Sequence, residues 1–250
     1  MNESKIKITK AKETSEGRGA TVQRSFPTPD LSFVDPFVLM DHFFVEPPAG
    51  FPSHPHRGFE VITYMLEGSF EHEDSTGAKE VIKKNGVQRV TTGKGIEHSE
   101  MPGSEGINSG IQLWINLPSK LKLIEPDYAT YLPDQFPLDK RNGTTVKTIV
   151  GEGSPINLKT QIEYYDIKLN KASYDITFEG DYNGFIYIIS GNGKATFNSQ
   201  EQDLEKYQVI LKDDDSLEQI EISSEDEIRF ILLKGKPHNE PIKLRGPFVD

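Results

Sequence analysis

Apolar and polar residues follow strand-like patterns along most of the chain. Residues 5–10 (Lys-Ile-Lys-Ile-Thr-Lys) alternate strictly, which places the apolar side chains of an extended strand on one face. Segments 34–45, 60–66 and 110–117 are instead dense in β-branched and aromatic residues, as buried strands are. Turn signals such as Asn85-Gly86 separate the segments,. This pattern predicts an all-β fold of short antiparallel strands, a barrel or a sandwich.

The strand pattern restarts in the second half of the chain. Tyr187–Gly191 echoes Thr63–Gly68, a weak internal repeat that favours a duplicated barrel. Residues 118–143 are rich in proline and polar groups and show no clear strand, so we interpret them as a connection with a short helical turn near 120–124. We therefore expect two domains, residues 1–135 and 136–250. Strands of the second half are predicted at 145–150, 161–169, 185–190, 194–197, 207–211 and 228–233.

Composition and charge exclude several classes of protein. No apolar run approaches the roughly 20 residues of a membrane helix, and residues 1–8 have no signal-peptide character,, so we expect a cytoplasmic protein. The absence of cysteine excludes disulfides and thiolate metal sites,. The net charge is -11 without a basic stripe, which argues against direct nucleic-acid binding. We interpret the acidic segment 200–228 as a solvated sheet face and turns.

Histidines gather in two short motifs, His54-Pro55-His56 and His98-Ser99-Glu100. Alternate side chains of a strand point to the same face, so each motif can aim two ligand atoms at one point. Two such strands side by side would direct four ligands at one metal ion. Imidazoles and a carboxylate suit Fe(II), Mn, Ni, Cu or Zn, and four ligands leave open positions on a six-coordinate metal. The motifs therefore predict a catalytic type of metal site.

The residues alone leave the carboxylate ligand undecided between Glu60 and Glu100. Glu60 has the strand parity of His54 and His56, although Gly58 between them can bulge the strand and re-aim it. Glu100 lies two residues from His98 on an unbroken segment. Proximity favours Glu100.

Other residues near the motifs have less specific signals. His42 ends a buried strand, where it either packs or supports the metal ligands, and Glu60 is the second residue predicted to support them. His72, between two glutamates beside a turn, is predicted at the surface. Four large apolar residues are predicted as barrel core that also walls the metal pocket: Phe43, Phe59, Met65 and Trp114.

Several segments resemble the pirin family of the cupin superfamily: residues 35–43, 54–60, 95–102, 113–118 and 239–249. The resemblance runs nearly end to end and is weakest from about 130 to 230. It implies two tandem cupin domains, which are jelly-roll β-barrels, with the metal in the first alone and the tail packed back on that domain. The ligands that it implies are His54, His56, His98 and Glu100, which decides the carboxylate in favour of Glu100.

The resemblance also implies two functions. The first is a quercetin (flavonol) 2,3-dioxygenase, in which one divalent metal binds the flavonol, O2 opens its ring and Glu100 acts as general base. We expect Fe(II), with Cu, Ni, Mn and Zn also compatible with the ligands. The alternative is an iron-dependent, redox-sensing regulatory protein that binds a transcription factor or a metabolic enzyme. In either case we expect a monomer.

Overall fold

The structure is a computed structural model that describes residues 7–178, 180–212 and 219–250, and these residues form two compact units. The N-terminal barrel comprises residues 12–135, 156–160 and 238–250. The C-terminal barrel comprises the described residues of 7–11, 136–155 and 161–237. The chain therefore does not divide at a single point near residue 135. Residues 7–11 belong to the C-terminal barrel, and residues 238–250 belong to the N-terminal barrel.

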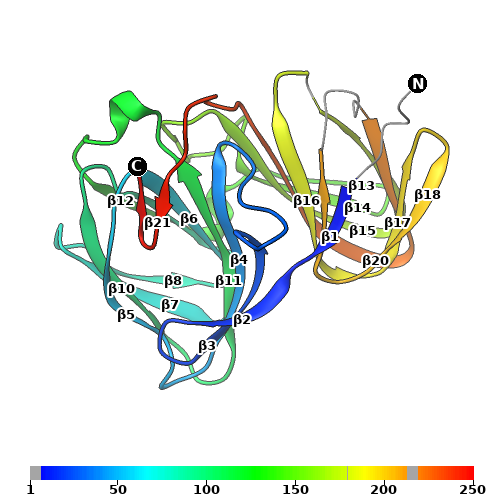
Figure 1. Cartoon of the computed structure of the whole chain (residues 1–250). Coiled ribbons are helices and arrows are strands. Elements are labelled where there is room, and N and C mark those ends of the chain that lie inside the picture. Colours follow the sequence, from blue (N-terminus) through cyan, green and yellow to red (C-terminus); the bar gives the residue numbers. More distant parts are fainter. Residues whose placement is uncertain (1–6, 179, 213–218) are drawn as a thin grey trace. The chain divides into compact units, whose positions relative to one another are not determined.

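The N-terminal barrel consists of two antiparallel sheets (Figure 1). The larger sheet has the order β12-β9-β6-β11-β4-β3-β2, and the smaller has the order β5-β10-β7-β8. Their bounds are β2 Lys12–Glu16, β3 Ala20–Phe26, β4 Phe37–Val45, β5 Phe51–His56, β6 Phe59–Glu67, β7 Ser69–Asp74, β8 Lys79–Lys83, β9 Val87–Thr91, β10 Ile96–Pro102, β11 Asn108–Asn116 and β12 Asp127–Tyr131.

Strand β6 places both apolar and polar side chains in the interior of this barrel. Phe59 and Val61 belong to one buried apolar cluster, and Met65 belongs to a second. Thr63 lies between them on the same strand face, is fully buried, and donates a hydrogen bond to Glu100. The two apolar clusters thus contribute the hydrophobic stabilisation while the stretch between them carries hydrogen-bonded polar groups.

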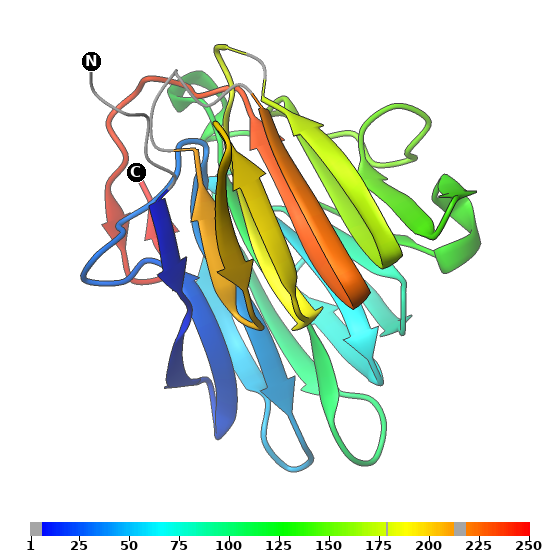
Figure 2. The ribbon, with the colours of Figure 1, turned by 90° about the vertical axis from the view of Figure 1, so that its right-hand side faces the viewer.

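The C-terminal barrel is built on one nine-stranded antiparallel sheet. Its long strand β20 lies between β16 and β15 and is seen in orange in Figure 2. Its core is a buried apolar cluster that includes Ile188, Ile222 and Phe230, and no histidine occurs between residues 99 and 237. The strands are β1 Lys7–Lys10, β13 Leu138–Arg141, β14 Thr144–Val150, β15 Ile162–Thr177, β16 Asn183–Gly191, β17 Gly193–Phe197, β18 Gln200–Leu204, β19 Gln208–Leu211 and β20 Gln219–Gly235.

The last residues of the chain return to the N-terminal barrel as a small hairpin, β21 (Leu244–Arg245) and β22 (Phe248–Val249). Val249 is fully buried in the cluster that contains Phe59 and Trp114. Phe248 forms a parallel bridge with Arg57, directly after β5. We call residues 244–250 the C-terminal strap.

The structure confirms the predicted all-β fold, with one clear error in the connection. Segment 118–143 contains strands β12 and β13 as well as two short 3-10 helices, η1 (Ser119–Leu121) and η2 (Pro133–Gln135). Both strands are sheet edges. Their mostly polar residues, partly exposed in β12 and fully exposed in β13, lack the apolar density of a central strand. In the acidic segment, β18 is largely exposed, while 213–218 lie outside the described residues. No helix in the described part of the chain has the length and hydropathy of a membrane span.

Candidate metal centre

Antiparallel pairing of β5 with β10 brings the two histidine motifs together. His54 is the register partner of His98, although 44 positions separate them in the sequence. The Nε2 atom of His54 lies 3.0 Å from that of His56 and 3.1 Å from that of His98. Three imidazole nitrogens from two strands therefore converge on one point, as the alternation of strand side chains predicts.

The hydrogen bonds behind His54 and His56 fix which ring nitrogen carries the proton. The Nδ1 atom of His54 lies 2.8 Å from the Pro52 carbonyl, and that of His56 lies 3.3 Å from the Pro247 carbonyl. A carbonyl only accepts, so each Nδ1 is an N–H donor and each neutral ring presents a bare Nε2. Two lone pairs 3.0 Å apart repel unless a cation lies between them. The donor set thus fits a metal ion.

Burial keeps the imidazoles of His56 and His98 neutral. Desolvation, together with the neighbouring imidazoles of His98 and His54, lowers the pKa of His56 to about 3,. Desolvation also lowers the pKa of His98 well below its ordinary value. Neutral imidazole is the form that binds metals, so His56 and His98 are ready to bind a metal at neutral pH.

Glu100 is held beside this cluster by three hydrogen bonds. Its Oε1 accepts from Gln88 Nε2 at 2.6 Å and from Thr63 Oγ1 at 3.2 Å. Its Oε2 accepts from Gln112 Nε2 at 2.7 Å. The ligand atoms form two overlapping groups, each within 4.8 Å: the three histidines, and His98 with Glu100 and His72. A register shift between His98 and Glu100 in the β5–β10 pairing accompanies this offset.

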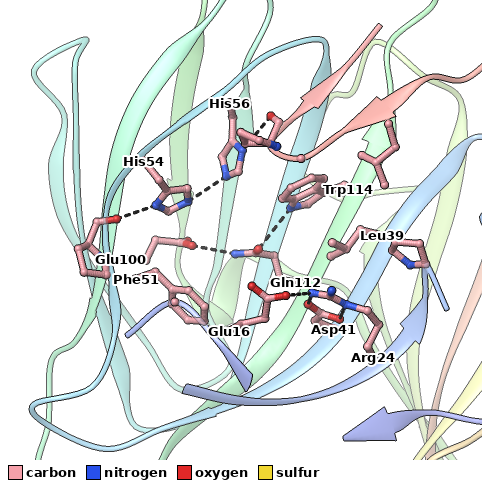
Figure 3. A pocket seen from close by; sticks show the side chains of 16 residues that line it. Glu16, Arg24, Leu39, Asp41, Phe51, His54, His56, Glu100, Gln112 and Trp114 are labelled. Atoms are coloured by element: carbon pink, nitrogen blue, oxygen red, sulfur yellow. Dashed lines mark hydrogen bonds and ion pairs between the residues drawn. The ribbon is translucent and has the colours of Figure 1, made fainter. Parts of the chain in front are cut away.

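A cavity of about 540 Å³ opens in front of His54, His56 and Glu100 (Figure 3). This volume lies within the roughly 300–1,000 Å³ typical of small-molecule sites. Trp114 forms part of its wall and donates its indole N–H to Gln112 Oε1 at 3.3 Å. The cavity is lined by Glu16, Gly17, Arg24, Pro27, Leu39, Asp41, Phe51, Pro52, His54, His56, Glu100, Gln112, Trp114, Leu244, Gly246 and Pro247.

A part-buried ion pair forms a second polar part of the cavity wall. Arg24 donates to both carboxylate oxygens of Asp41, at 2.9 and 2.6 Å, and also pairs with Glu16 at 2.8 Å. Burial raises the pKa of Asp41 despite this bidentate partner. Figure 3 shows the three side chains together, separate from the histidines. The sequence carries no signal for this group, because each member looks like an ordinary strand charge.

Of the four apolar residues predicted to wall the pocket, Trp114 lines the cavity. The other three lie in the core. Phe43 stacks on Phe70 with ring centroids 4.6 Å apart, in the same cluster as Met65. Phe59 stacks behind Trp114 at 4.2 Å. The rest of the observed apolar wall includes Leu39, Phe51 and residues of the strap. These residues lie far apart in the sequence, so no local pattern indicates that they share a wall.

Glu60 and His42 point away from the histidine cluster. Gly58 has φ +89, which breaks the strand parity between His56 and Glu60. Fully buried Glu60 accepts hydrogen bonds from Thr91 Oγ1 and from the Lys159 backbone N–H, both at 2.8 Å. His42 follows the cavity-lining Asp41 on β4 and so lies on the opposite strand face, where its ring packs against Phe44.

The surface position predicted for His72 was wrong. His72 is 1% exposed, lies 2.9 Å through Nε2 from Asp74 Oδ2, and stacks on Tyr128. It is the register partner of Glu100 across β7 and β10. The alternation of β7 carried the signal, because exposed Glu71 and Glu73 direct the intervening side chain inward,.

Comparisons with known proteins agree with this architecture. The Pirin family model matches residues 19–115, and the model of the Pirin C-terminal cupin domain matches residues 164–250. A pirin-like protein of Solanum lycopersicum is 40% identical over 249 residues, covering 98% of this chain and 85% of the relative. Human Pirin is 39% identical over 246 residues, covering 96% and 84%.

Solved structures also match this chain over nearly its whole length. A quercetin 2,3-dioxygenase from Acinetobacter baumannii is 27% identical with a TM-score of 0.87, covering 97% of this chain and 90% of that one. The bacterial pirin YhhW of Escherichia coli, solved in complex with nickel(II), is 21% identical with a TM-score of 0.76, covering 93% and 100%. At 21% identity, the likeness to YhhW shows the fold alone.

Two cupin barrels in one chain, with a cluster of histidines in the first that can hold a metal ion, define a bicupin. The matches at both ends of the sequence, and relatives of about 40% identity along nearly its whole length, identify the family. This chain belongs to the pirin family.

Proposed function

We propose that this protein is a metal-dependent oxygenase that acts on flavonols in the manner of a quercetin 2,3-dioxygenase. The observation that carries the proposal is the position of the histidine cluster. His54 and His56 lie in the wall of a cavity large enough for a flat aromatic molecule,. A structural metal needs no such access, whereas a metal that reacts with substrate does.

In this proposal His54, His56 and His98 hold one divalent metal, and Glu100 approaches it as fourth ligand. Fe(II) is our first candidate, and the three imidazoles with one carboxylate also accept Cu, Ni, Mn and Zn. When bound, the metal would supply Lewis acidity toward the flavonol 3-hydroxyl oxygen and an open position for O2.

Glu100 is the group that would accept the 3-hydroxyl proton. Glu100 lines the cavity, and its Oε2 is held by Gln112, whose amide is oriented in turn by the Trp114 indole N–H. Trp114 donates to the Gln112 oxygen, so the Gln112 N–H must point to Glu100. A carboxylate fixed in this way is a suitably placed general base for a substrate hydroxyl.

The cavity wall suits a flat, hydroxylated substrate. Trp114, Leu39 and Phe51 offer apolar surface to aromatic rings,. Arg24 and its two carboxylate partners offer donors and acceptors to ring hydroxyls away from the histidines. This division between apolar walls and a few placed polar groups is typical of small-molecule sites.

The test is turnover of quercetin by metal-loaded protein. Wild-type protein is loaded anaerobically with Fe(II), its metal content is measured, and quercetin and O2 are then supplied. We expect metal-dependent loss of the flavonol absorbance with release of carbon monoxide. Glu100→Gln protein at equal metal content serves as the control and should turn over at least tenfold more slowly. Full metal content without turnover by the wild type would refute the oxygenase.

A further inference from the structure

We propose that Lys122 is a positioning residue of the metal centre, which clamps the C-terminal strap to the end of β5 and so orients the ring of His56. The inference rests on the metal site proposed above. It assigns a role to a lysine that touches neither a predicted ligand nor the cavity lining, and it explains why the strap belongs to the site.

Lys122 directly follows the short helix η1 as its C-cap residue and is half-buried. Its ammonium group donates to the Gly58 carbonyl at 3.0 Å, the Val249 carbonyl at 2.8 Å and Asn116 Oδ1 at 2.7 Å. An ammonium group has three N–H donors, so all three are used. Two of the acceptors are backbone carbonyls, one on each of the segments that the lysine joins.

The first of these segments is the corner that follows the β5 histidines. Gly58 comes two residues after His56, and its N–H donates to the Gly93 carbonyl at 2.9 Å, just before the His98 strand. This corner therefore ties the ends of β5 and β10. Displacement of Gly58 would disturb the strands that carry both histidine motifs.

The second segment is the strap, which lies against the same corner. The Val249 N–H donates to the Arg57 carbonyl at 3.0 Å. The Arg57 guanidinium lies 4.8 Å above the Phe248 ring and pairs with Asp250 at 2.8 Å. A Cβ at Gly58 would come within 2.0 Å of the Val249 oxygen, so the close approach requires glycine.

The strap in turn contacts the metal cluster. The Pro247 carbonyl accepts from His56 Nδ1–H at 3.3 Å, which presents the bare Nε2 to the other imidazoles (Figure 3). Leu244, Gly246 and Pro247 also line the cavity. Hydrogen bonds behind a metal-binding imidazole raise its basicity and fix its direction, and their loss typically lowers metal affinity 10–100-fold. Lys122 thus acts on His56 through the strap.

The experiment compares Lys122→Met with Lys120→Met, an exposed lysine on the same helical turn. Nickel(II) affinity is measured by competition with a chelator, and release of the strap by limited proteolysis of the full-length protein. We expect Lys122→Met to bind nickel about tenfold more weakly and to be cleaved faster within the strap. Lys120→Met should match the wild type in both measurements.

The readouts separate positioning from general stability. A lysine that merely stabilised the fold would lower the melting temperature without changing nickel affinity far below it, and that result would overturn the inference. If Lys122→Met fails to fold, Arg57→Ala replaces it, because Arg57 is 40% exposed and holds the strap from its outer side. It should weaken nickel binding by about threefold; unchanged affinity with a released strap would also overturn the inference. A wild type that binds no nickel would refute the metal site itself.

Discussion

The Nε2 atoms of His54 and His98 lie 3.1 Å apart across strands β5 and β10. No covalent feature brings them together; strand pairing and side-chain alternation do. With the Nδ1 atom of His54 donating to a backbone carbonyl, its Nε2 lone pair needs a cation or a donor in front of it. The proposed metal binding therefore depends on imidazoles from two strands that converge on one point.

The two competing carboxylates should separate cleanly when each is replaced by its amide. Glu100→Gln should reduce metal affinity and quercetin turnover by at least tenfold, because the amide cannot accept the substrate proton. Glu60→Gln should leave both unchanged and lower the free energy of unfolding by about 1–3 kcal/mol, because the amide N–H₂ would face one of the two donors, the Thr91 hydroxyl or the Lys159 N–H,. Metal titration and chemical denaturation check both variants. The reverse pattern would reassign the ligand to Glu60.

Removal of Arg24 should destabilise the protein through the carboxylate it leaves behind. Arg24→Met strands Asp41, whose side chain is 8% exposed, and we expect a loss of about 3 kcal/mol in the free energy of unfolding. Replacement of both residues, Arg24→Met with Asp41→Leu, should recover most of the loss because no unpaired charge stays buried. Urea denaturation measures this. A double variant no more stable than the single would show that the pair matters for another reason.

Gly58→Ala tests the contact between the strap and the β5 corner, with Gly77→Ala as a matched control. Both glycines have positive φ, +89 and +94, so each alanine should cost about 1–2 kcal/mol of backbone strain. Only at Gly58 would the new Cβ meet backbone, since nothing lies within 4 Å of one at Gly77. We expect Gly58→Ala to be the more destabilised in thermal unfolding and to bind nickel more weakly. Equal effects would exclude a close strap contact.

The stability of metal-free protein should fall as the pH drops below about 6.5. The folded pKa of His56, about 3, is below its ordinary 6.5. Between these values the unfolded chain binds a proton that the folded chain does not, so acid favours unfolding by about 1.4 kcal/mol per pH unit for this histidine. Denaturation of wild type and His56→Ala across this range checks the sign. An equal pH dependence in the two proteins would contradict the assignment.

The sequence was sufficient for the fold class because apolar alternation and β-branched strands repeat along the chain. It also indicated which histidines converge, since a pair two residues apart shares a strand face. It was not sufficient for the position of Glu60, because the positive φ of Gly58 resets the parity. Nor did it reveal the contacts of the strap. The family resemblance implied only that the tail packs on the first domain, and contacts such as His56 with Pro247, 191 residues apart, have no local signal.

The most direct test of the central claim is the metal content of protein dialysed against Fe(II) under anaerobic conditions, measured for the wild type and for His54→Ala. If His54, His56 and His98 bind one metal together, wild-type protein will retain about one iron per chain and His54→Ala will retain much less. A wild type without bound iron or another divalent metal, or a His54→Ala protein with the same content as the wild type, would contradict it.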